Sequence, residues 1–161
     1  MTIDFQQARF TMVEQQVRPW EVLDPRVLET LMTVRREDFV PPRHRKLAFA
    51  DLPLPLEHGE VMMKPVVEGR MMQAMAITPG DDVLEIGTGS GFITACLAAL
   101  ARDVTSIDRH ADFVERARAR LVADSVTNVR IETADAFAWE PGRQFDAIYL
   151  HGAEPASQFT L

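Results

Sequence analysis

The second half of the chain contains glycines and acidic residues whose types and spacing fit the binding of a nucleotide-like ligand. Gly87, Gly89 and Gly91 form a G-x-G-x-G loop after an apolar run, and Glu85 precedes the loop. A phosphate-binding P-loop would need Gly-Lys-Ser or Gly-Lys-Thr, whereas Phe92 follows the last glycine. A dinucleotide loop prefers the spacing G-x-G-x-x-G, and an acid beside it would repel a pyrophosphate. The loop therefore favours a ligand with a positive ammonium group and no phosphate.

Two further acids follow expected strand ends. Asp108 comes about 20 residues after Gly87, the spacing at which an acid accepts both hydroxyls of a ribose. Asp135 follows the next expected strand, where it could bind the amino group of an adenine. Either aspartate alone would more often be a helix cap, but with Glu85 they form a series of three acids at three strand ends. This series predicts a site for S-adenosyl-L-methionine, which carries an ammonium, a ribose and an adenine.

After the turn Thr78-Pro79-Gly80-Asp81, the sequence alternates between strand-like and helix-like segments. The expected strands and helices, in chain order, cover residues 83–86, 92–101, 104–107, 111–123, 129–132 and 145–150. Such alternation indicates an α/β fold with a parallel sheet and right-handed crossovers. Ligands of these sheets bind beyond the carboxyl ends of the strands, where the glycines and acids are expected to lie.

The preceding 78 residues have helical patterns instead. Helices are expected over 5–17, from Pro25 after the N-cap Asp24, and from Pro65. The last of these helices has an apolar stripe formed by Val67, Met71, Ala74 and Met75. This stripe is expected to lie in the core, because methionine fills irregular gaps there. The chain thus divides into a helical subdomain, 1–78, and an α/β subdomain, 79–161.

Composition and charge exclude several classes of protein. The 161 residues carry a net charge of −7, which argues against a nucleic-acid binder because such proteins need a basic surface. Cys96 is the single cysteine, so neither a disulfide framework nor a cysteine metal cage is expected, and no metal site is predicted. The N-terminus lacks the apolar core of a signal peptide, and no run of about 20 apolar residues could span a membrane. A soluble, cytoplasmic protein is expected.

With these features, the chain resembles the protein-L-isoaspartate O-methyltransferases over nearly all of its length. The segment VLEIGTGSGF is similar to the cofactor loop of that family. The more specific similarity lies in the N-terminal segments MVEQQVRPWEVLDPRVLETLMTVRREDFVPP and AFADLPLP, because many methyltransferases share the glycine loop. The resemblance implies a Rossmann-like methyltransferase three-layer sandwich, in which residues 1–78 form a helical lid over the substrate. It also implies methyl transfer to the isoaspartyl carboxylate of damaged proteins or peptides.

The resemblance assigns roles to the acids and to the glycine loop. It implies that Glu85 and the first two glycines hold the methionine part of the cofactor, that Asp108 binds the ribose, and that Asp135 and Ala136 lie near the adenine. The complete set of expected cofactor-binding residues is Glu85, Gly87, Thr88, Gly89, Ser90, Gly91, Asp108, Asp135 and Ala136.

A carboxylate acceptor makes small demands on catalytic residues. Its pKa near 4 leaves it ionised at pH 7, so no general base is needed, and binding and orientation supply most of the acceleration. The sequence fits this requirement, because outside the cofactor acids it shows no histidine–carboxylate pair. Its four histidines, His44, His58, His110 and His151, are scattered. Of these, His58 and His151 are the candidates for a polar contact with the substrate.

One segment departs from the family pattern. Where the family has Gly-Gln-Thr-Ile-Ser-x-Pro, the chain has GEVMMKP over residues 59–65. Val61 replaces the threonine, and Met63 replaces the serine whose hydroxyl helps to hold the substrate. Met63 therefore occupies the family's catalytic position without a hydrogen-bond donor, and Lys64 is the nearest group that could compensate. Isoaspartyl specificity stays open, as do a different acceptor and a cofactor-binding protein without catalysis.

The length of the chain is a second departure. Members of the family continue with further strands and helices beyond Leu161, so the C-terminal strands of the sheet are expected to be missing. In the family's strand order, the apolar strand over 145–150 would then lie at an edge of the sheet. An unpaired apolar edge invites self-association, so either a homo-oligomer or an aggregate through this strand is expected, or else a longer natural protein.

Overall fold

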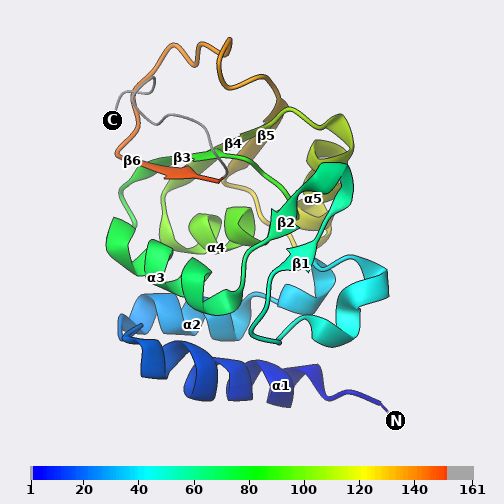
Figure 1. Ribbon diagram of the computed structural model, residues 1–161. Coiled ribbons are helices and arrows are strands. Elements are labelled where there is room, and N and C mark those ends of the chain that lie inside the picture. Colours follow the sequence, from blue (N-terminus) through cyan, green and yellow to red (C-terminus); the bar gives the residue numbers. More distant parts are fainter. Residues whose placement is uncertain (1, 152–161) are drawn as a thin grey trace. The chain divides into compact units, whose positions relative to one another are not determined.

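The computed structural model describes residues 2–151 and divides the chain into two compact units, Met1–Ala76 and Ile77–Leu161 (Figure 1). The elements of the second unit alternate as the sequence predicts. They are β3 (Asp82–Ile86), α4 (Phe92–Leu100), β4 (Asp103–Asp108), α5 (Ala111–Ala123), β5 (Val129–Thr133) and β6 (Ala147–Leu150). β6 begins two residues later than expected. Within residues 2–151, no helix combines the length and apolar character needed to cross a membrane.

The four strands of the second unit form a parallel sheet in the order β5-β4-β3-β6. From β3 the chain moves outward through β4 to β5 and then returns to place β6 on the other side of β3. The strand order therefore reverses between β3 and β6, and ligands of open α/β sheets bind at such a switch point. The predicted α/β class with a parallel sheet is confirmed.

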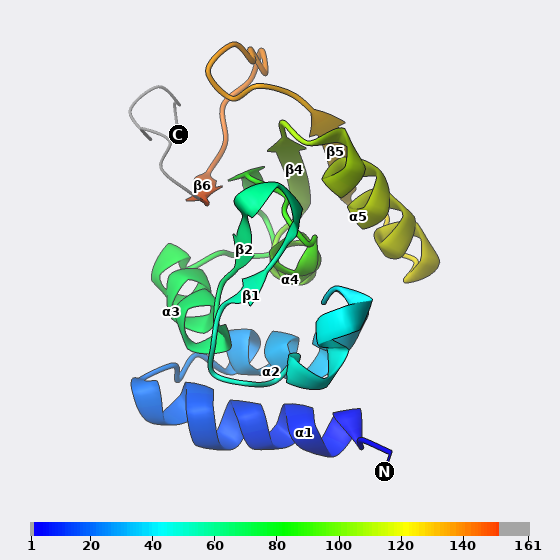
Figure 2. The ribbon, with the colours of Figure 1, turned by 45° about the vertical axis from the view of Figure 1, so that its right-hand side comes forward.

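The alternation of side chains along each strand separates the two faces of the sheet. On one face, Leu84 and Ile86 pack with Ile107 and Phe145 in a buried apolar cluster. On the other face, α4 packs against β4, and α5 lies along β4 and β5 (Figure 2). Glu85 points to the face of α4, because its carboxylate is bonded to a hydroxyl of that helix.

At the amino end of the sheet, Asp82 joins three segments. Its carboxylate accepts hydrogen bonds from Arg102 Nε at 2.9 Å and from Arg143 Nη2 at 2.7 Å. The hydrogen bond from Arg102 holds the pKa of Asp82 below its usual value, and the positive charges of Arg102 and Arg143 act in the same direction. These contacts tie the start of β3 to the loops before β4 and β6, at the end of the sheet opposite to the glycine loop.

We expect Arg102→Gln to lower the free energy of unfolding at pH 7 and to lose that effect in acid. A carboxylate with a depressed pKa in the folded state stabilises the fold above its unfolded pKa of about 3.9, and the contribution disappears as the pH falls through the folded pKa. Urea unfolding of the wild type and the variant between pH 7 and pH 2 measures the difference. Arg116→Gln, which removes an exposed helical pair with Asp112, is the matched control. A difference that persists unchanged at pH 2 would contradict the role of Asp82.

The first unit is built mainly from short helices, which match the helical patterns of the sequence. They are α1 (Phe5–Met12), a π-helical turn (Val13–Val17), α2 (Pro25–Thr33), α3 (Pro65–Met75) and 3₁₀ turns at Arg18–Trp20, Arg36–Asp38, Pro42–Leu47 and Glu57–Gly59. β1 (Leu54–Pro55) and β2 (Val61–Met62) form a small antiparallel pair. As predicted, Asp24 caps α2 and Pro25 is its first residue. The helix expected over 5–17 is continuous in the chain but changes from α to π geometry at Val13.

The predicted core stripe of α3 is wrong. Val67, Met71 and Met75 are half-buried, and Ala74 is exposed. The buried face carries Pro65, Val66, Glu68, Gly69 and Met72 instead. The reason is tertiary: a Cβ atom at Gly69 would lie 3.1 Å from Val17, so the helix approaches its neighbours through this glycine. Glu68 is drawn inward on the same face because it pairs with Arg36.

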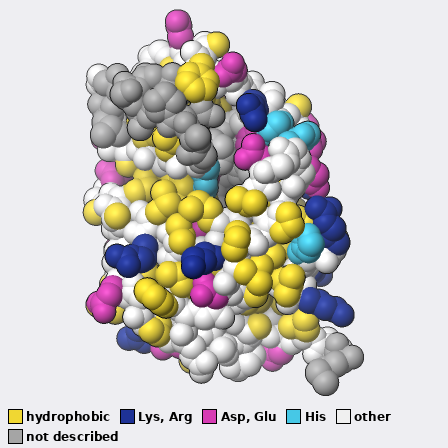
Figure 3. All heavy atoms as spheres, in the orientation of Figure 1, with side chains coloured by type: hydrophobic (Ala, Val, Ile, Leu, Met, Phe, Trp, Pro, Cys, Tyr) yellow, Lys and Arg dark blue, Asp and Glu magenta, His cyan; other side chains and the backbone are white. Residues whose placement is uncertain are grey.

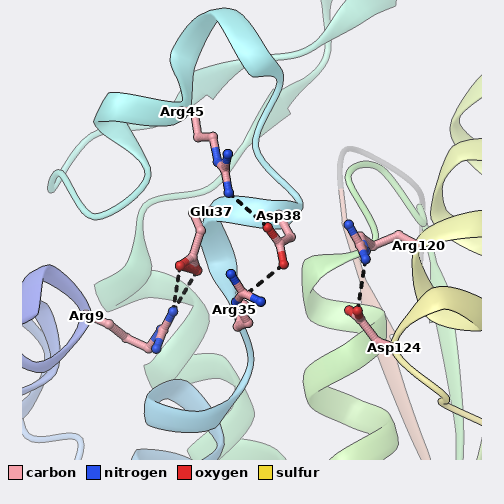
Figure 4. Close-up of polar contacts among 7 residues, drawn as sticks. All are labelled: Arg9, Arg35, Glu37, Asp38, Arg45, Arg120 and Asp124. Atoms are coloured by element: carbon pink, nitrogen blue, oxygen red, sulfur yellow. Dashed lines mark hydrogen bonds and ion pairs between the residues drawn. The ribbon is translucent and has the colours of Figure 1, made fainter. Parts of the chain in front are cut away.

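A second buried ion pair anchors α1 to the turn that follows α2. Arg9 Nη2 lies 2.7 Å from both carboxylate oxygens of Glu37, and both side chains are buried (Figure 4). Beside it, Asp38 accepts a hydrogen bond from Arg45 at 3.2 Å and pairs with Arg35 at 3.5 Å. Arginine and carboxylate side chains are therefore structural partners in this unit, and the sequence reading did not single out any of these pairs.

Candidate functional site

The glycine loop joins the carboxyl end of β3 to the start of α4. Gly87, Gly89 and Gly91 have φ values of 98°, 52° and 87°, a region that residues with a side chain rarely adopt. The amides of Gly87 and Thr88 both donate to the carbonyl of Ile107, at 2.8 and 3.2 Å. The loop therefore follows the end of β4, and its positive φ values alone are a sufficient reason for the three glycines. It also brings backbone amides to the edge of the sheet where ligands bind.

Gly87 has a second reason to lack a side chain. A Cβ atom built at this position would lie 2.9 Å from the Cβ of His151, which is closer than such atoms approach in proteins. The backbone amide of His151 donates to the carbonyl of Ile86 at 2.9 Å, so its position beside the loop is fixed by the ladder between β6 and β3. The loop and the residue that follows β6 are thus packed directly against each other.

Asp108 is the last residue of β4, and its carboxylate is bonded on both oxygens. Oδ2 accepts from the amide of Gly89 at 3.0 Å, and Oδ1 accepts from the amide of His110 at 2.9 Å. Asp108 therefore anchors the glycine loop and also orders the start of α5. A carboxylate has about four lone-pair sites, so these two bonds leave acceptor capacity for the hydroxyls of a ribose.

Asp135 lies two residues beyond the end of β5 and is exposed. Its Oδ1 accepts from the amide of Phe137 at 3.0 Å, which closes a turn in this loop. The amide of Ala134 donates to the carbonyl of Asp108 at 3.0 Å, so the loop starts beside the end of β4. Ala136 is half-buried against the apolar cluster of the sheet. The structure thus brings the three predicted acids to the carboxyl ends of three adjacent strands.

Glu85 differs from the two aspartates because it is fully buried. Its Oε1 accepts hydrogen bonds from the hydroxyls of Thr94 and Ser106, the latter at 2.6 Å. Its Oε2 lies 3.0 Å from Nε2 of His151. The hydroxyl of Ser106 is also 2.6 Å from that of Thr88, so the network continues into the glycine loop.

The sequence did not predict the pair of Glu85 and His151. Glu85 was expected at the cofactor and His151 at the substrate, yet these two residues are hydrogen-bonded although 66 positions separate them. They meet because β3 and β6 are neighbours in the sheet, and Glu85 stands in register with Tyr149, two residues before His151. Strand order decides such a meeting, and a single sequence does not show it.

The remaining candidates belong to the first unit. His58 is exposed on a 3₁₀ turn, and Val61 is 58% exposed on β2. Met63 and Lys64 are half-buried, and Lys64 occupies the N-cap position of α3. Val61 is one of several large apolar side chains of this unit that are exposed; the others among the described residues are Phe10, Trp20, Leu23, Leu47 and Leu52. Figure 3 shows hydrophobic side chains gathered at the surface of one face. The segment over 59–65 therefore presents apolar groups where the family has hydroxyls.

Arg36 binds the backbone of this segment, and the sequence did not predict this role. Its guanidinium donates to the carbonyl of Met63 at 2.9 Å and to the carbonyl of Ala48 at 2.7 Å, and it pairs with the buried carboxylate of Glu68. Arg36 is 1% exposed. One buried cation thus fixes the backbone at the candidate substrate position. An arginine within a helical stretch does not by itself reveal this role in the sequence.

The sheet order, the loop after β3 and the acids at three strand ends define a Rossmann-like methyltransferase fold. The chain belongs to the family "Protein-L-isoaspartate(D-aspartate) O-methyltransferase (PCMT)", whose family model matches residues 8–158. The resemblance found in the sequence is therefore confirmed.

Among curated proteins, protein-L-isoaspartate O-methyltransferase 1 of Rhodopseudomonas palustris (strain HaA2) is 40% identical over 152 residues, which are 94% of this chain and 62% of that protein. The protein-L-isoaspartate O-methyltransferase of Koribacter versatilis (strain Ellin345) is 38% identical over 91% of this chain and 67% of its own length. The chain thus spans about two thirds of the length of these relatives.

Solved structures share the fold. A protein-L-isoaspartate O-methyltransferase from Plasmodium falciparum, determined in complex with S-adenosyl-L-homocysteine, has a TM-score of 0.72 at 18% identity and covers 92% of this chain and 73% of that chain. A second protein-L-isoaspartate O-methyltransferase has a TM-score of 0.74 at 20% identity over 90% of this chain and 47% of that chain. These likenesses confirm the expected fold.

Proposed function

We propose that the protein is an S-adenosyl-L-methionine-dependent methyltransferase that methylates the isoaspartyl carboxylate of damaged proteins or peptides. The observation that carries this proposal is the position of Glu85, Asp108 and Asp135 at the ends of three adjacent strands, around one glycine loop. Membership of the family and the identity to the Rhodopseudomonas protein support it. The cytoplasm is the proposed location.

The described residues fit the proposed cofactor. S-adenosyl-L-methionine supplies an electrophilic methyl group when bound. Asp108 retains lone pairs for the ribose hydroxyls, and exposed Asp135 can accept from the adenine amino group, with Ala136 as an apolar neighbour. Gly89 carries no side chain, so the methionine part of the cofactor could approach the backbone of the loop closely at this position.

The chain's part in the reaction is to bind and orient the two reactants. An isoaspartyl carboxylate is ionised at pH 7, so no residue has to remove a proton from it. Residues 1–78 are proposed to form the lid that holds the substrate and keeps water away, with His58, Val61, Met63, Lys64 and His151 as candidate contacts. Holding the acceptor oxygen in line with the methyl group supplies most of the acceleration.

A labelled-methyl transfer assay tests this function. Aged protein, which accumulates isoaspartyl residues, is compared with freshly prepared protein as acceptor. Base-labile label on the aged sample alone is the expected result, since the product is a methyl ester. Equal labelling of both samples would point to another acceptor.

Replacement of Asp108 by alanine should weaken binding of S-adenosyl-L-homocysteine by about 1–3 kcal/mol, or roughly 5- to 150-fold in Kd, because ribose hydroxyls and the Gly89 amide lose their acceptor. Isothermal titration calorimetry measures the change. Asp112→Ala, a surface aspartate on α5, is the control and should bind like the wild type. Tight binding of NAD by the wild type, without a response to S-adenosyl-L-homocysteine, would refute the cofactor assignment.

A second candidate function keeps the cofactor and changes the acceptor. It is favoured by Val61 and Met63, which place apolar side chains where the family pattern has hydroxyls. A smaller, more apolar acceptor than an isoaspartyl peptide would suit this segment. Loss of catalysis with retained cofactor binding is the third possibility, and binding without turnover on a panel of acceptors would identify it.

The edge of the sheet predicts self-association. Among residues 2–151, β6 pairs with β3 on one side and has no strand on the other, and its apolar residues include Ile148 and Leu150. We propose that the 161-residue chain forms a homo-oligomer through β6, because an unpaired apolar edge offers backbone hydrogen bonds to a second copy. Light scattering should give a mass that rises with concentration. A monodisperse monomer over the same range would contradict the proposal.

A further inference from the structure

The residue that follows β6 lies at the point where the strand order reverses. His151 extends the ladder between β6 and β3, because its amide donates to the carbonyl of Ile86 at 2.9 Å. Its imidazole packs on Tyr149, with ring centroids 4.5 Å apart, and keeps 23% of its side-chain surface exposed. The ring therefore has a fixed place between the buried network and the ligand-binding edge of the sheet.

The imidazole completes the hydrogen bonds of a carboxylate that has no access to water. Glu85 is 0% exposed, and a buried carboxylate is costly unless it is fully hydrogen-bonded. Thr94 and Ser106 both donate to Oε1, whereas in the described part of the chain it is His151 that contacts Oε2, at 3.0 Å. With Nε2 as donor, His151 provides a hydrogen bond to Oε2, the carboxylate oxygen that neither hydroxyl contacts.

The same network contacts the glycine loop at two residues, Gly87 and Thr88. On one side, His151 lies against the backbone of Gly87, where an added Cβ would come within 2.9 Å. On the other side, the hydroxyl of Thr88 is 2.6 Å from Ser106, which bonds to Glu85. Loss of the imidazole would therefore remove the partner of Glu85 Oε2 and also the ring atoms beside Gly87, which lie 3.6 Å from that Cβ position.

We infer that His151 is a positioning residue, which holds the loop over Gly87–Gly91 in its cofactor-binding conformation through Glu85. This role rests on the proposed cofactor binding and changes the expected role of Glu85. Because Thr94, Ser106 and His151 already occupy its buried carboxylate, Glu85 acts on the methionine end of the cofactor through the loop and not by direct contact with the ammonium group.

Three substitutions of His151 test the role. His151→Gln keeps an amide donor of similar reach for Glu85, while His151→Ala removes it and His151→Asn makes it too short. We expect the alanine and asparagine variants to bind S-adenosyl-L-homocysteine at least about 10-fold more weakly by calorimetry, the scale for a lost bond to a charged group, and the glutamine variant to stay within about threefold of the wild type. His44→Ala, on a 3₁₀ turn of the first unit, is the control and should not change Kd.

A second readout separates this role from the proposed function. Amide hydrogen exchange of Gly87 and Gly89, measured by NMR without ligand, should be about 10-fold or more faster in His151→Ala and His151→Asn than in the wild type and His151→Gln. Unchanged exchange in folded variants, or a glutamine variant as impaired as alanine, would overturn the positioning role. Absence of cofactor binding in the wild type would instead refute the proposed function, and the exchange rates would still decide whether His151 holds the loop.

Discussion

Replacement of Arg36 by methionine should lower the free energy of unfolding by about 3–5 kcal/mol, the range for breaking a buried ion pair on one side. Arg36 is 1% exposed and its partner Glu68 is 2% exposed, so the substitution removes a cation that pairs with a carboxylate in the interior. It also removes the donors to the carbonyls of Ala48 and Met63. Urea unfolding followed by circular dichroism measures the loss.

Two controls show whether burial is the cause. Arg18→Met removes an exposed pair with Glu14 on one helical turn, and it should cost no more than about 0.5 kcal/mol. The double variant Arg36→Met/Glu68→Met should recover part of the loss, since apolar residues of similar volume often replace a buried pair at little cost. A loss below about 1 kcal/mol for Arg36→Met would show that the pair contributes little to the fold.

Replacement of Met63 by serine should raise the rate of isoaspartyl methylation about 10- to 150-fold, with the larger gain when Val61→Thr is added. A thioether cannot donate a hydrogen bond, whereas a hydroxyl can donate to the substrate carboxylate, and a donor to a charged group contributes about 1.5–3 kcal/mol. Serine is also smaller than methionine, so the change would add space at this position. Initial rates of methyl transfer to an isoaspartyl peptide measure the gain.

The control for this change is Met75→Ser, which alters another half-buried methionine of the same unit, at the end of α3. It should leave the rate within about twofold of the wild type. Rapid turnover by the wild type, with an unchanged or slower rate in Met63→Ser, would show that the hydroxyl is dispensable. The assignment of an isoaspartyl substrate would then stand despite the altered segment over 59–65.

The sequence by itself determined the strands, the helices of the α/β unit and the cofactor-site candidates. Local signals carry these features: apolar runs become buried strands, glycines mark the turn after β3, and each acid follows the end of its own strand. Because parallel strands end at one edge of the sheet, an acid at each strand end predicts one common site without knowledge of the strand order. The placement of Asp108 beside the loop follows from this rule alone.

Only the tertiary structure decided which distant residues share a buried environment. Glu85 meets His151 because β6 pairs with β3 in the sheet. Glu68 faces inward because it forms an ion pair with buried Arg36. Hydrophobic periodicity treats charged residues as surface, so it misplaced the buried face of α3 and gave no sign of either pair. A charge is buried only when its partner is present, and that partner is supplied by the packing of segments that lie far apart along the chain.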